Sequence, residues 1–317
     1  MEYKEHPNNK IKHWSEGIAY EIAFWNNVYR WKNTFSGMMG WSNHCQIIKL
    51  ENFDCNRFLT SCQTEPNVLD IGCGMSYTTG NYIKPENGAQ RAVNIHYVDP
   101  LAPFFNDILK RYSSRIKKRL GYMLPDIEFG MVEYISSFYP HNTVDLAIIQ
   151  NALDHSALPI KGLLEAIECL KTGGKLYLNH HPNEAETEHY KGFHQYNINN
   201  ENGKLIIWNK NERHDINSLI SQFADITVST GIDKHVIAVI TKRNNVPCEL
   251  LNHKEDKQYL CRQMMTEIIN GTKINNFIKW KLKYWTYNII QFFIQSLSWE
   301  RKMKIKRLIK QTNDNNR

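Results

Sequence analysis

Seven short apolar runs alternate with helix-like segments between residues 67 and 241 of this 317-residue chain, and this alternation constrains the fold more than any other feature. Strands separated by helices predict a parallel sheet with helices on both of its faces. The last two runs lie only a few residues apart, so they must pair antiparallel, because a parallel crossover needs about a dozen residues. The predicted strands are residues 67–71, 92–98, 127–132, 144–149, 174–179, 225–230 and 235–241.

The expected fold class is therefore α/β: a Rossmann-like, doubly wound, mainly parallel seven-stranded sheet whose last strand is antiparallel. We divide the chain into a helical N-terminal cap (1–60), a central domain (61–243), and a linker followed by a basic helical tail (244–317). Apolar residues at three- and four-residue steps predict the helices. These helices cover residues 13–32, 45–59, 104–119, 159–170 and 258–270.

The chain has seven cysteines, an odd number, and no C-x-x-C pair. This pattern indicates a reducing compartment and argues against both a disulfide framework and a cysteine zinc site. Residues 1–12 are polar and carry no apolar signal-peptide core, and the sequence contains no run of about 18 apolar residues. We therefore expect a cytoplasmic protein.

Positive charge is concentrated at the C-terminal end. Residues 273–317 carry a net charge of +9, which leaves −2 for the rest because the whole chain carries +7. For residues 273–310 we consider a helix on the inner face of an anionic membrane, a contact with a partner enzyme, or packing on the protein's own body. Nucleic acid is disfavoured, because the near-neutral remainder supplies no wider basic footprint. The apolar residues that can share one face of this helix are Trp285, Ile289, Phe292, Phe293 and Leu297.

An apolar strand runs into an acid and a Gly-x-Gly turn at Val68–Gly74, and a second strand ends on Asp99. The glycines let the backbone approach a ligand without a Cβ in the way. Two neighbouring parallel strands that each end on an acid form a nucleoside site at a topological switch point. A dinucleotide-binding turn needs a third glycine where this chain has Tyr77, which disfavours an NAD-type cofactor.

This neighbourhood resembles the class I S-adenosylmethionine (SAM)-dependent methyltransferases, of the type 11/12-like group, over about residues 66–181. Val68–Gly74 matches the family's first motif, and Val144–Asn151 matches its fourth strand. Leu153-Asp154-His155 falls where many members have a hydrophobic-x-His triplet. Residues 170–176 match the family's turn into the fifth strand, except for one proline.

The resemblance implies SAM as the cofactor and assigns residues to it. Asp70 and the two turn glycines would line its amino-acid end, and Asp99 would bind the ribose hydroxyls. Met131 replaces the family's usual acid near the adenine amino group, so only the backbone contact at Val132 is carried over. The cofactor-binding residues implied in this way are Asp70, Gly72, Cys73, Gly74, Asp99, Pro100, Val132 and Gln150.

Methyl transfer to a hydroxyl needs a general base, and histidine is the most frequent one. Histidines follow the predicted strands 144–149 and 174–179, whose carboxyl ends open on the crevice. The polar segment 179–197 is predicted to cover the crevice as a lid, and residues 205–208 to add a hairpin. His194 is the preferred base and His155 the second candidate, with His181, Tyr190 and Gln195 as substrate contacts.

No metal site is expected from the sequence, because the spacing of His180, His181 and His189 matches no recognised ligand pattern. The function we expect is SAM-dependent methylation of a hydroxyl or amine on a polar small molecule, such as a sugar or cell-surface glycan precursor. The polar lid looks similar to methyltransferases encoded with bacterial surface-polysaccharide genes. The alternatives are an RNA methyltransferase and a catalytically idle methyltransferase-fold module that binds a partner through its tail.

Overall fold

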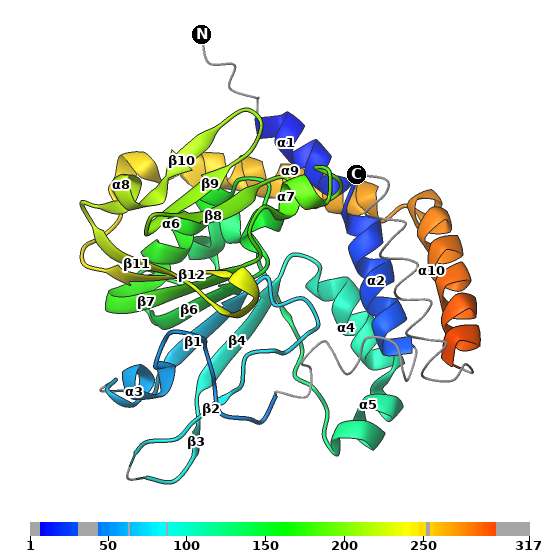
Figure 1. The fold of residues 1–317 in the computed structure, drawn as a ribbon, viewed down its shortest axis with the longest axis horizontal. Helices are drawn as coiled ribbons and strands as arrows, with labels where there is room; N and C mark the ends of the chain where they lie inside the picture. Colours follow the sequence, from blue (N-terminus) through cyan, green and yellow to red (C-terminus); the bar gives the residue numbers. More distant parts are fainter. Residues whose placement is uncertain (1–6, 31–43, 63, 87, 252–253, 296–317) are drawn as a thin grey trace.

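A central sheet with helices packed against both faces organises the molecule (Figure 1). The computed structural model describes residues 7–30, 44–62, 64–86, 88–251 and 254–295. The strands of this sheet are β1 Asn67–Ile71, β4 Asn94–Asp99, β5 Glu128–Phe129, β6 Val144–Gln150, β7 Leu170–His180, β11 Ala224–Thr230 and β12 Val236–Lys242. Their order in space is β11-β12-β7-β6-β1-β4-β5.

Strand β12 runs against the other strands of the sheet. It pairs antiparallel with both β7 and β11, whereas the pairs formed by β1, β4, β5, β6 and β7 among themselves are parallel. The short connection from β11 to β12 forces this reversal. The predicted fold class is thereby confirmed. The predicted strand 127–132 was too long, because a 3-10 turn begins at Val132.

The helices and the smaller sheets surround this core. The helices are α1 Pro7–Ser15, α2 Ile18–Arg30, α3 Cys55–Thr60, α4 Ala102–Arg111, α5 Ser113–Leu120, α6 Pro159–Cys169, α7 Glu184–Thr187, α8 Ile216–Ile220, α9 Lys254–Gly271 and α10 Ile274–Gln295. The predicted hairpin forms from β8 Asn197–Glu201 and β9 Lys204–Trp208, with β10 Arg213–Asp215 beside it. A two-stranded ribbon pairs β2 Tyr82–Ile83 with β3 Arg91–Ala92.

Three predicted helices differ from the structure. The helix predicted over 13–32 is two helices that meet at Gly17, where an added Cβ would lie 2.6 Å from the Phe193 ring. The helix predicted over 104–119 is divided at Tyr112. The helix predicted over 45–59 begins only at Cys55, because the preceding residues form bridges and turns, among them a parallel bridge from Ile47 to Tyr82.

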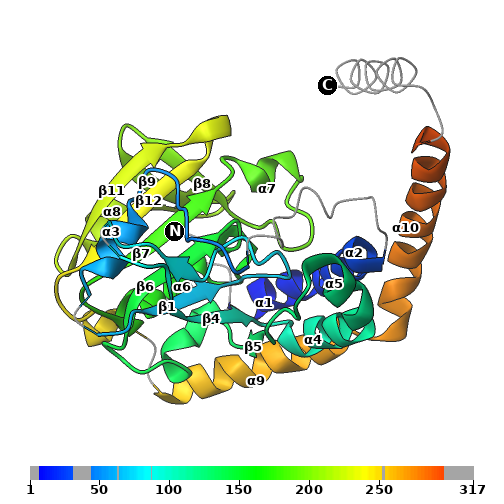
Figure 2. The same ribbon diagram turned by 90° about the horizontal axis from the view of Figure 1, so that it is seen from below.

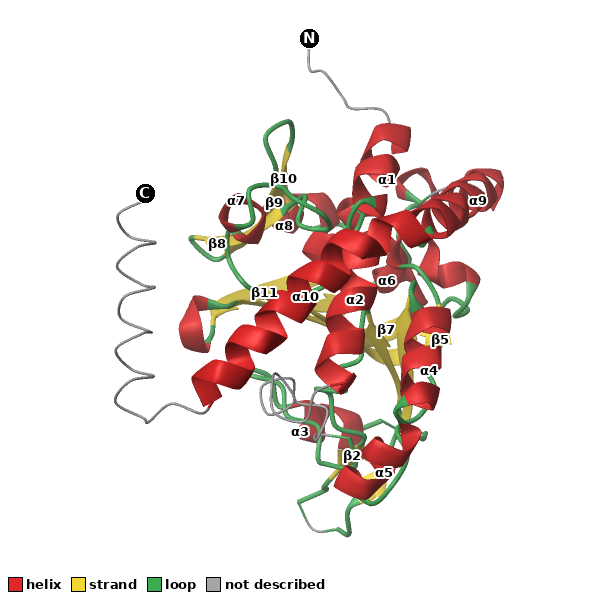
Figure 3. Cartoon of the chain, turned by 90° about the vertical axis from the view of Figure 1, so that its right-hand side faces the viewer, coloured by secondary structure: helices red, strands yellow, loops and turns green. Residues whose placement is uncertain are grey.

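The first two and the last two described helices pack against each other. Helix α9 packs on α1, and α10 lies beside α2 (Figure 3). The Tyr20 and Trp280 rings meet at 4.7 Å, and Asn288 Nδ2 donates a hydrogen bond to Asn27 Oδ1 at 2.8 Å. One side of α10 therefore packs on the protein's own body.

The other side of α10 carries an exposed apolar stripe. Figure 2 shows this helix at the edge of the molecule, away from the central sheet. Of the predicted apolar face, Trp285 and Ile289 are exposed, whereas the side chains of Phe292 and Phe293 and all of Leu297 lie outside the described residues. No described helix is long and apolar enough to cross a membrane. The exposed apolar residues of the stripe are Ile274, Ile278, Leu282, Trp285 and Ile289.

Candidate functional site

A cavity of about 610 Å³ opens at the carboxyl ends of β1, β4, β6 and β7. Residues of α1 and α2 and of the lid segment form its outer wall. Of the residues expected to bind cofactor, substrate or a proton, those on this cavity are Gly72, Cys73, Gly74, Asp99, Pro100, Val132, Gln150, His155, His181 and His194. Segments far apart in the sequence therefore share one site.

The Gly-x-Gly turn needs both of its glycines. Gly72 and Gly74 have φ of +68° and +53°, a left-handed conformation that L side chains adopt at a cost. A Cβ on Gly72 would lie 2.5 Å from the Ala152 Cβ, and one on Gly74 would lie 2.9 Å from Trp25 Cζ2. Bare backbone thus faces the cavity at this turn.

We expect Gly72→Ala to lower the free energy of unfolding more than Gly203→Ala. Both positions have strongly positive φ, but nothing lies within 4 Å of a Cβ built on Gly203. Gly203→Ala should therefore cost only the backbone strain, about 1–2 kcal/mol, whereas Gly72→Ala should add a packing cost of about 1–3 kcal/mol. Urea denaturation measures both variants. Equal losses of unfolding free energy in the two variants would show that the contact with Ala152 adds no cost at Gly72.

Asp99 lies at the floor of the cavity and is 7% exposed. Its Oδ2 accepts a hydrogen bond from the Gly74 backbone N–H at 3.0 Å, and its Oδ1 accepts one from the Leu101 N–H at 2.8 Å. These bonds fix the carboxylate and leave each oxygen a second lone pair for a ligand hydroxyl. Burial raises the pKa of Asp99 to about 6, although the two backbone bonds oppose the shift.

Asp70 does not lie on the described wall of the cavity. It is buried beneath it, where its carboxyl is hydrogen-bonded to Thr79. Gln150 Nε2 donates to Thr79 Oγ1 at 3.1 Å, so a polar chain runs from buried Asp70 through Thr79 to Gln150, which lines the cavity. Burial raises the pKa of Asp70 to about 7. Asp70 thus supports the crevice through Thr79 and Gln150 and has no cavity-lining position of its own.

The turn after β5 supplies the next part of the wall. Val132 lines the cavity, whereas Met131 is buried with its sulfur at 2.5 Å from the Tyr134 hydroxyl. Glu133 accepts hydrogen bonds from the Ser156 hydroxyl and the Ala157 N–H, at 2.7 and 2.9 Å. This acid therefore holds the segment after β6 against the segment after β5.

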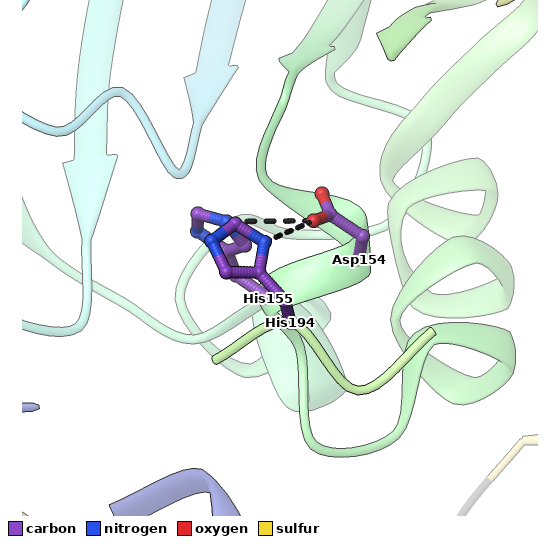
Figure 4. Close-up of side chains that lie close together, drawn as sticks. All are labelled: Asp154, His155 and His194. Carbon is purple, nitrogen blue, oxygen red and sulfur yellow. Dashed lines mark hydrogen bonds and ion pairs between the residues drawn. The ribbon is translucent and has the colours of Figure 1, made fainter. Parts of the chain in front are cut away.

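Three side chains converge in Figure 4, and the two histidines among them line the cavity. His194 Nδ1 lies 3.2 Å from Asp154 Oδ2 and 3.2 Å from His155 Nε2, and His155 Nε2 lies 3.4 Å from the same carboxylate oxygen. Asp154 and His155 follow β6 on a 3-10 turn, Leu153–His155, and His194 comes from the lid. We call Asp154, His155 and His194 the histidine cluster.

The carboxylate organises the charge of this cluster. Burial would raise the pKa of Asp154, but His155, His180 and His194 outweigh that effect and hold it below its usual range. Burial lowers the pKa of His155 to about 4. Burial also acts to lower the pKa of His194, but the hydrogen bond and charge of Asp154 reverse this and raise it. The two imidazole pKa values therefore shift in opposite directions, so a proton bound to the cluster favours His194 over His155.

Sequence reasoning missed the contribution of α2 to the cavity. Glu21 lines it and accepts a hydrogen bond from Trp25 Nε1 at 2.8 Å. Burial, and next the charge of Asp99, raise the pKa of Glu21 to about 7. Trp14 and Phe193 form an aromatic contact at the lid, with ring centroids 5.5 Å apart. The apolar stripe of residues 13–32 marked a helix but gave no sign of its distance from the crevice.

Two of the expected substrate contacts do not line the cavity. Gln195 Nε2 donates to the backbone oxygens of Tyr190 and Gly192, so it stabilises the lid from within. The Tyr190 hydroxyl accepts from Asn197 Nδ2, also away from the described wall. His181 is on the wall, with its ring 4.1 Å from that of His235.

The structure combines three features: this order of seven strands, a reversed strand beside β7, and a cavity at the carboxyl ends of the parallel strands. This is a Rossmann-like, doubly wound fold with one reversed strand, as the sequence predicted. No protein-family model matches the sequence, and a search of curated proteins finds no significant match.

Several solved methyltransferase structures are similar to this fold. One is a chain of the complex between the Haloferax volcanii Trm112 methyltransferase activator and a methyltransferase, at 12% identity and a TM-score of 0.40, over 73% of this chain and 99% of that one. A SAM-dependent methyltransferase from Aquifex aeolicus has 14% identity and a TM-score of 0.33, over 60% and 89% of the two chains. The T. thermophilus 16S rRNA N2 G1207 methyltransferase, in complex with AdoMet and guanosine, has 12% identity and a TM-score of 0.32, over 62% and 40%.

Proposed function

We propose that this protein is a SAM-dependent methyltransferase. The observation that carries the proposal is the crevice in which the bare backbone of Gly72 and Gly74 faces the buried carboxylate of Asp99. Asp99 would hold the ribose hydroxyls, and the turn would hold the amino-acid end. Asp99, which is buried, and Glu21, which is half-buried, also give the cavity two acids, which suit a cationic ligand such as a sulfonium.

When bound, SAM supplies an activated methyl group, which leaves sulfur and forms a bond to the acceptor atom. The residues of this chain would hold the acceptor in line with that group and exclude water. A hydroxyl acceptor must also lose its proton. Two histidines of the cluster line the cavity and either can receive it, with His194 as our first candidate and His155, whose pKa is lowered, as the second.

We propose a polar small molecule as the acceptor, with a sugar hydroxyl as the leading example. The wall near the histidine cluster combines aromatic rings with amide, imidazole and carboxylate groups, a set that suits a hydroxyl-rich ligand. The cavity is walled on its outer side by α1, α2 and the lid, which favours a small acceptor over a long RNA strand. The polar groups of this wall are Asn151, Asn179, His181, Glu184, His194 and His235.

Calorimetric titration with SAM tests the proposal directly, followed by transfer of labelled methyl from SAM to a panel of nucleotide sugars. We expect saturable one-site binding and labelling of at least one sugar. A folded protein that binds no SAM would contradict the proposal. Labelling of RNA instead, with binding that weakens steeply as salt is added, would favour the RNA methyltransferase alternative.

We expect SAM to bind more tightly at pH 8 than at pH 5. The pKa of Asp99 is about 6, and those of Asp70 and Glu21 are about 7. A bound cation favours the ionised form of each of these acids. Binding should therefore release protons, and the affinity should fall as the pH falls through this range. One unit below the pKa of Asp99, that group alone accounts for about a tenfold loss.

Titrations at several pH values, in buffers of different ionisation enthalpy, measure both the affinity and the protons released. The Asp99→Asn variant is the control, because it removes one of the titrating groups and should flatten the profile. A dissociation constant that stays constant from pH 5 to pH 8 would contradict this account.

The exposed stripe of α10 supports a contact with an anionic membrane or a partner enzyme. Ile278 and Trp285 are more than half exposed, and lysines flank them on the same helix. Apolar side chains beside lysines suit an anionic interface. Co-sedimentation with phosphatidylglycerol vesicles, compared with neutral vesicles, separates membrane binding from a protein contact.

A further inference from the structure

The histidine cluster has the donor set and spacing of a metal site. Its three atoms, Asp154 Oδ2, His155 Nε2 and His194 Nδ1, lie 3.2–3.4 Å from one another. An ion about 2.1 Å from each of three ligands holds them about 3.0–3.4 Å apart in octahedral or tetrahedral geometry. The side chains therefore need little movement to bind one ion together.

The surroundings of Asp154 point to a missing partner. The carboxylate is 2% exposed, and its Oδ1 forms no well-aligned hydrogen bond with the described residues. His180, 1% exposed, lies behind it with Nδ1 at 3.5 Å from Oδ1. A buried imidazole in this position resembles the outer-shell groups that orient metal-binding carboxylates.

The cluster is open on the side of the cavity. His155 and His194 line the cavity, whereas Asp154 lies behind them. Glu184 is also on the wall, with its Oε1 at 4.0 Å from His194 Nδ1 and its Oε2 buried without a hydrogen bond to the described residues. Three ligands on one side leave the remaining coordination positions facing the space where an acceptor would bind.

We propose that Asp154, His155 and His194 bind a first-row divalent transition-metal cation whose open positions face the cavity. Two imidazoles and one carboxylate suit Zn²⁺, Fe²⁺, Mn²⁺ or Co²⁺ rather than Mg²⁺ or Ca²⁺, which prefer oxygen ligands. Binding of the ion rests on the cluster alone. The role of the ion rests on the proposed methyl transfer. It would hold the hydroxyl of the acceptor and favour loss of the hydroxyl proton to solvent. In that state His155 and His194 are ligands and receive no proton.

Titration of the full-length, chelator-treated protein with Co²⁺ tests the proposal. Imidazole-bound Co²⁺ gives visible d–d absorption, and thiolate charge-transfer bands would reveal binding at cysteines instead. We expect one equivalent to bind, Zn²⁺ to displace it and Mg²⁺ to have no effect. Asp154→Asn and His194→Gln should each weaken binding by more than about 100-fold, since loss of outer-shell groups alone costs about 10–100-fold.

His189→Gln is the matched control, because this histidine belongs to the same lid but is exposed. Circular dichroism checks that each variant is folded, and His194→Gln, at the cavity surface, serves if the buried Asp154→Asn does not fold. The proposal is wrong if folded protein binds no Co²⁺, in which case the cluster holds only a shared proton. It is also wrong if Co²⁺ binding survives His194→Gln or is lost in His181→Gln.

SAM binding measured on the same preparations keeps the two proposals apart. A protein that binds SAM but no Co²⁺ contradicts the metal site and leaves the methyltransferase proposal intact. A protein that binds Co²⁺ through the cluster but no SAM supports the metal site and contradicts the proposed function.

Discussion

Replacing Asp99 with alanine is expected to weaken SAM binding by at least about 100-fold. The carboxylate would accept hydrogen bonds from two ribose hydroxyls, and a hydrogen bond to a charged group contributes about 1.5–3 kcal/mol. Losing both therefore costs about 3 kcal/mol or more, and every 1.4 kcal/mol is about a tenfold change in affinity. Calorimetric titration with SAM measures the loss.

Two further variants make this result specific. Asp99→Asn keeps the shape and one good acceptor, so its loss should be smaller than that of the alanine variant. Asp107→Ala removes an exposed acid from α4, a few residues further along the chain, and should bind SAM normally. If Asp99→Ala and Asp107→Ala bind SAM equally well, the carboxylate does not hold the cofactor.

Lys257→Met is expected to lower the free energy of unfolding by about 3–5 kcal/mol. Lys257, on α9, lies 2.9 Å from the carboxylate of Glu165 on α6 and donates to the Ser136 hydroxyl at 2.8 Å. Glu165 is fully buried. Removing its partner leaves an uncompensated buried charge, which is far more costly than losing an exposed ion pair. Urea denaturation measures the change.

A second substitution separates the charge from the packing. The double variant Lys257→Met with Glu165→Gln removes the stranded charge and should recover most of the lost stability. Lys279→Met, at an exposed position on α10, should change stability by less than about 0.5 kcal/mol. A double variant as unstable as Lys257→Met alone would show that the lysine acts through its contacts and not through its charge.

The sheet could be predicted because its signals are local. Each strand is a short apolar run, and the few residues between 225–230 and 235–241 allow one pairing direction only. The Gly-x-Gly turn could be predicted for the same reason, since Gly72 and Gly74 need a backbone conformation that few other residues adopt. The first part of the helix predicted over 45–59 did not form, because bridges to distant residues, such as Tyr82, outweighed the local pattern.

The acceptor end of the site could not be predicted in the same way. Glu21, His155 and His194 are brought to one cavity from α2, a 3-10 turn and the lid, and no periodicity relates such positions. The expected histidines were found because their residue type suits proton transfer. The carboxylate that they share belongs to Asp154, the residue before His155 in the sequence. Only the fold places His194 against it.

The cavity wall has two separate origins. Gly72, Asp99 and Gln150 stand at strand ends, fixed by the ladder of the sheet, whereas Trp14 and Glu21 come from helices that precede the sheet in the chain. Helix α2 also touches the cofactor turn through Trp25, which lies beside Gly74, whereas α1 contributes Trp14 alone among the described residues of the wall. If the proposed methyl transfer holds, substitutions at Trp14 would alter the space for the acceptor, in evolution or by design, while the strand ends that form the cofactor crevice stay unchanged.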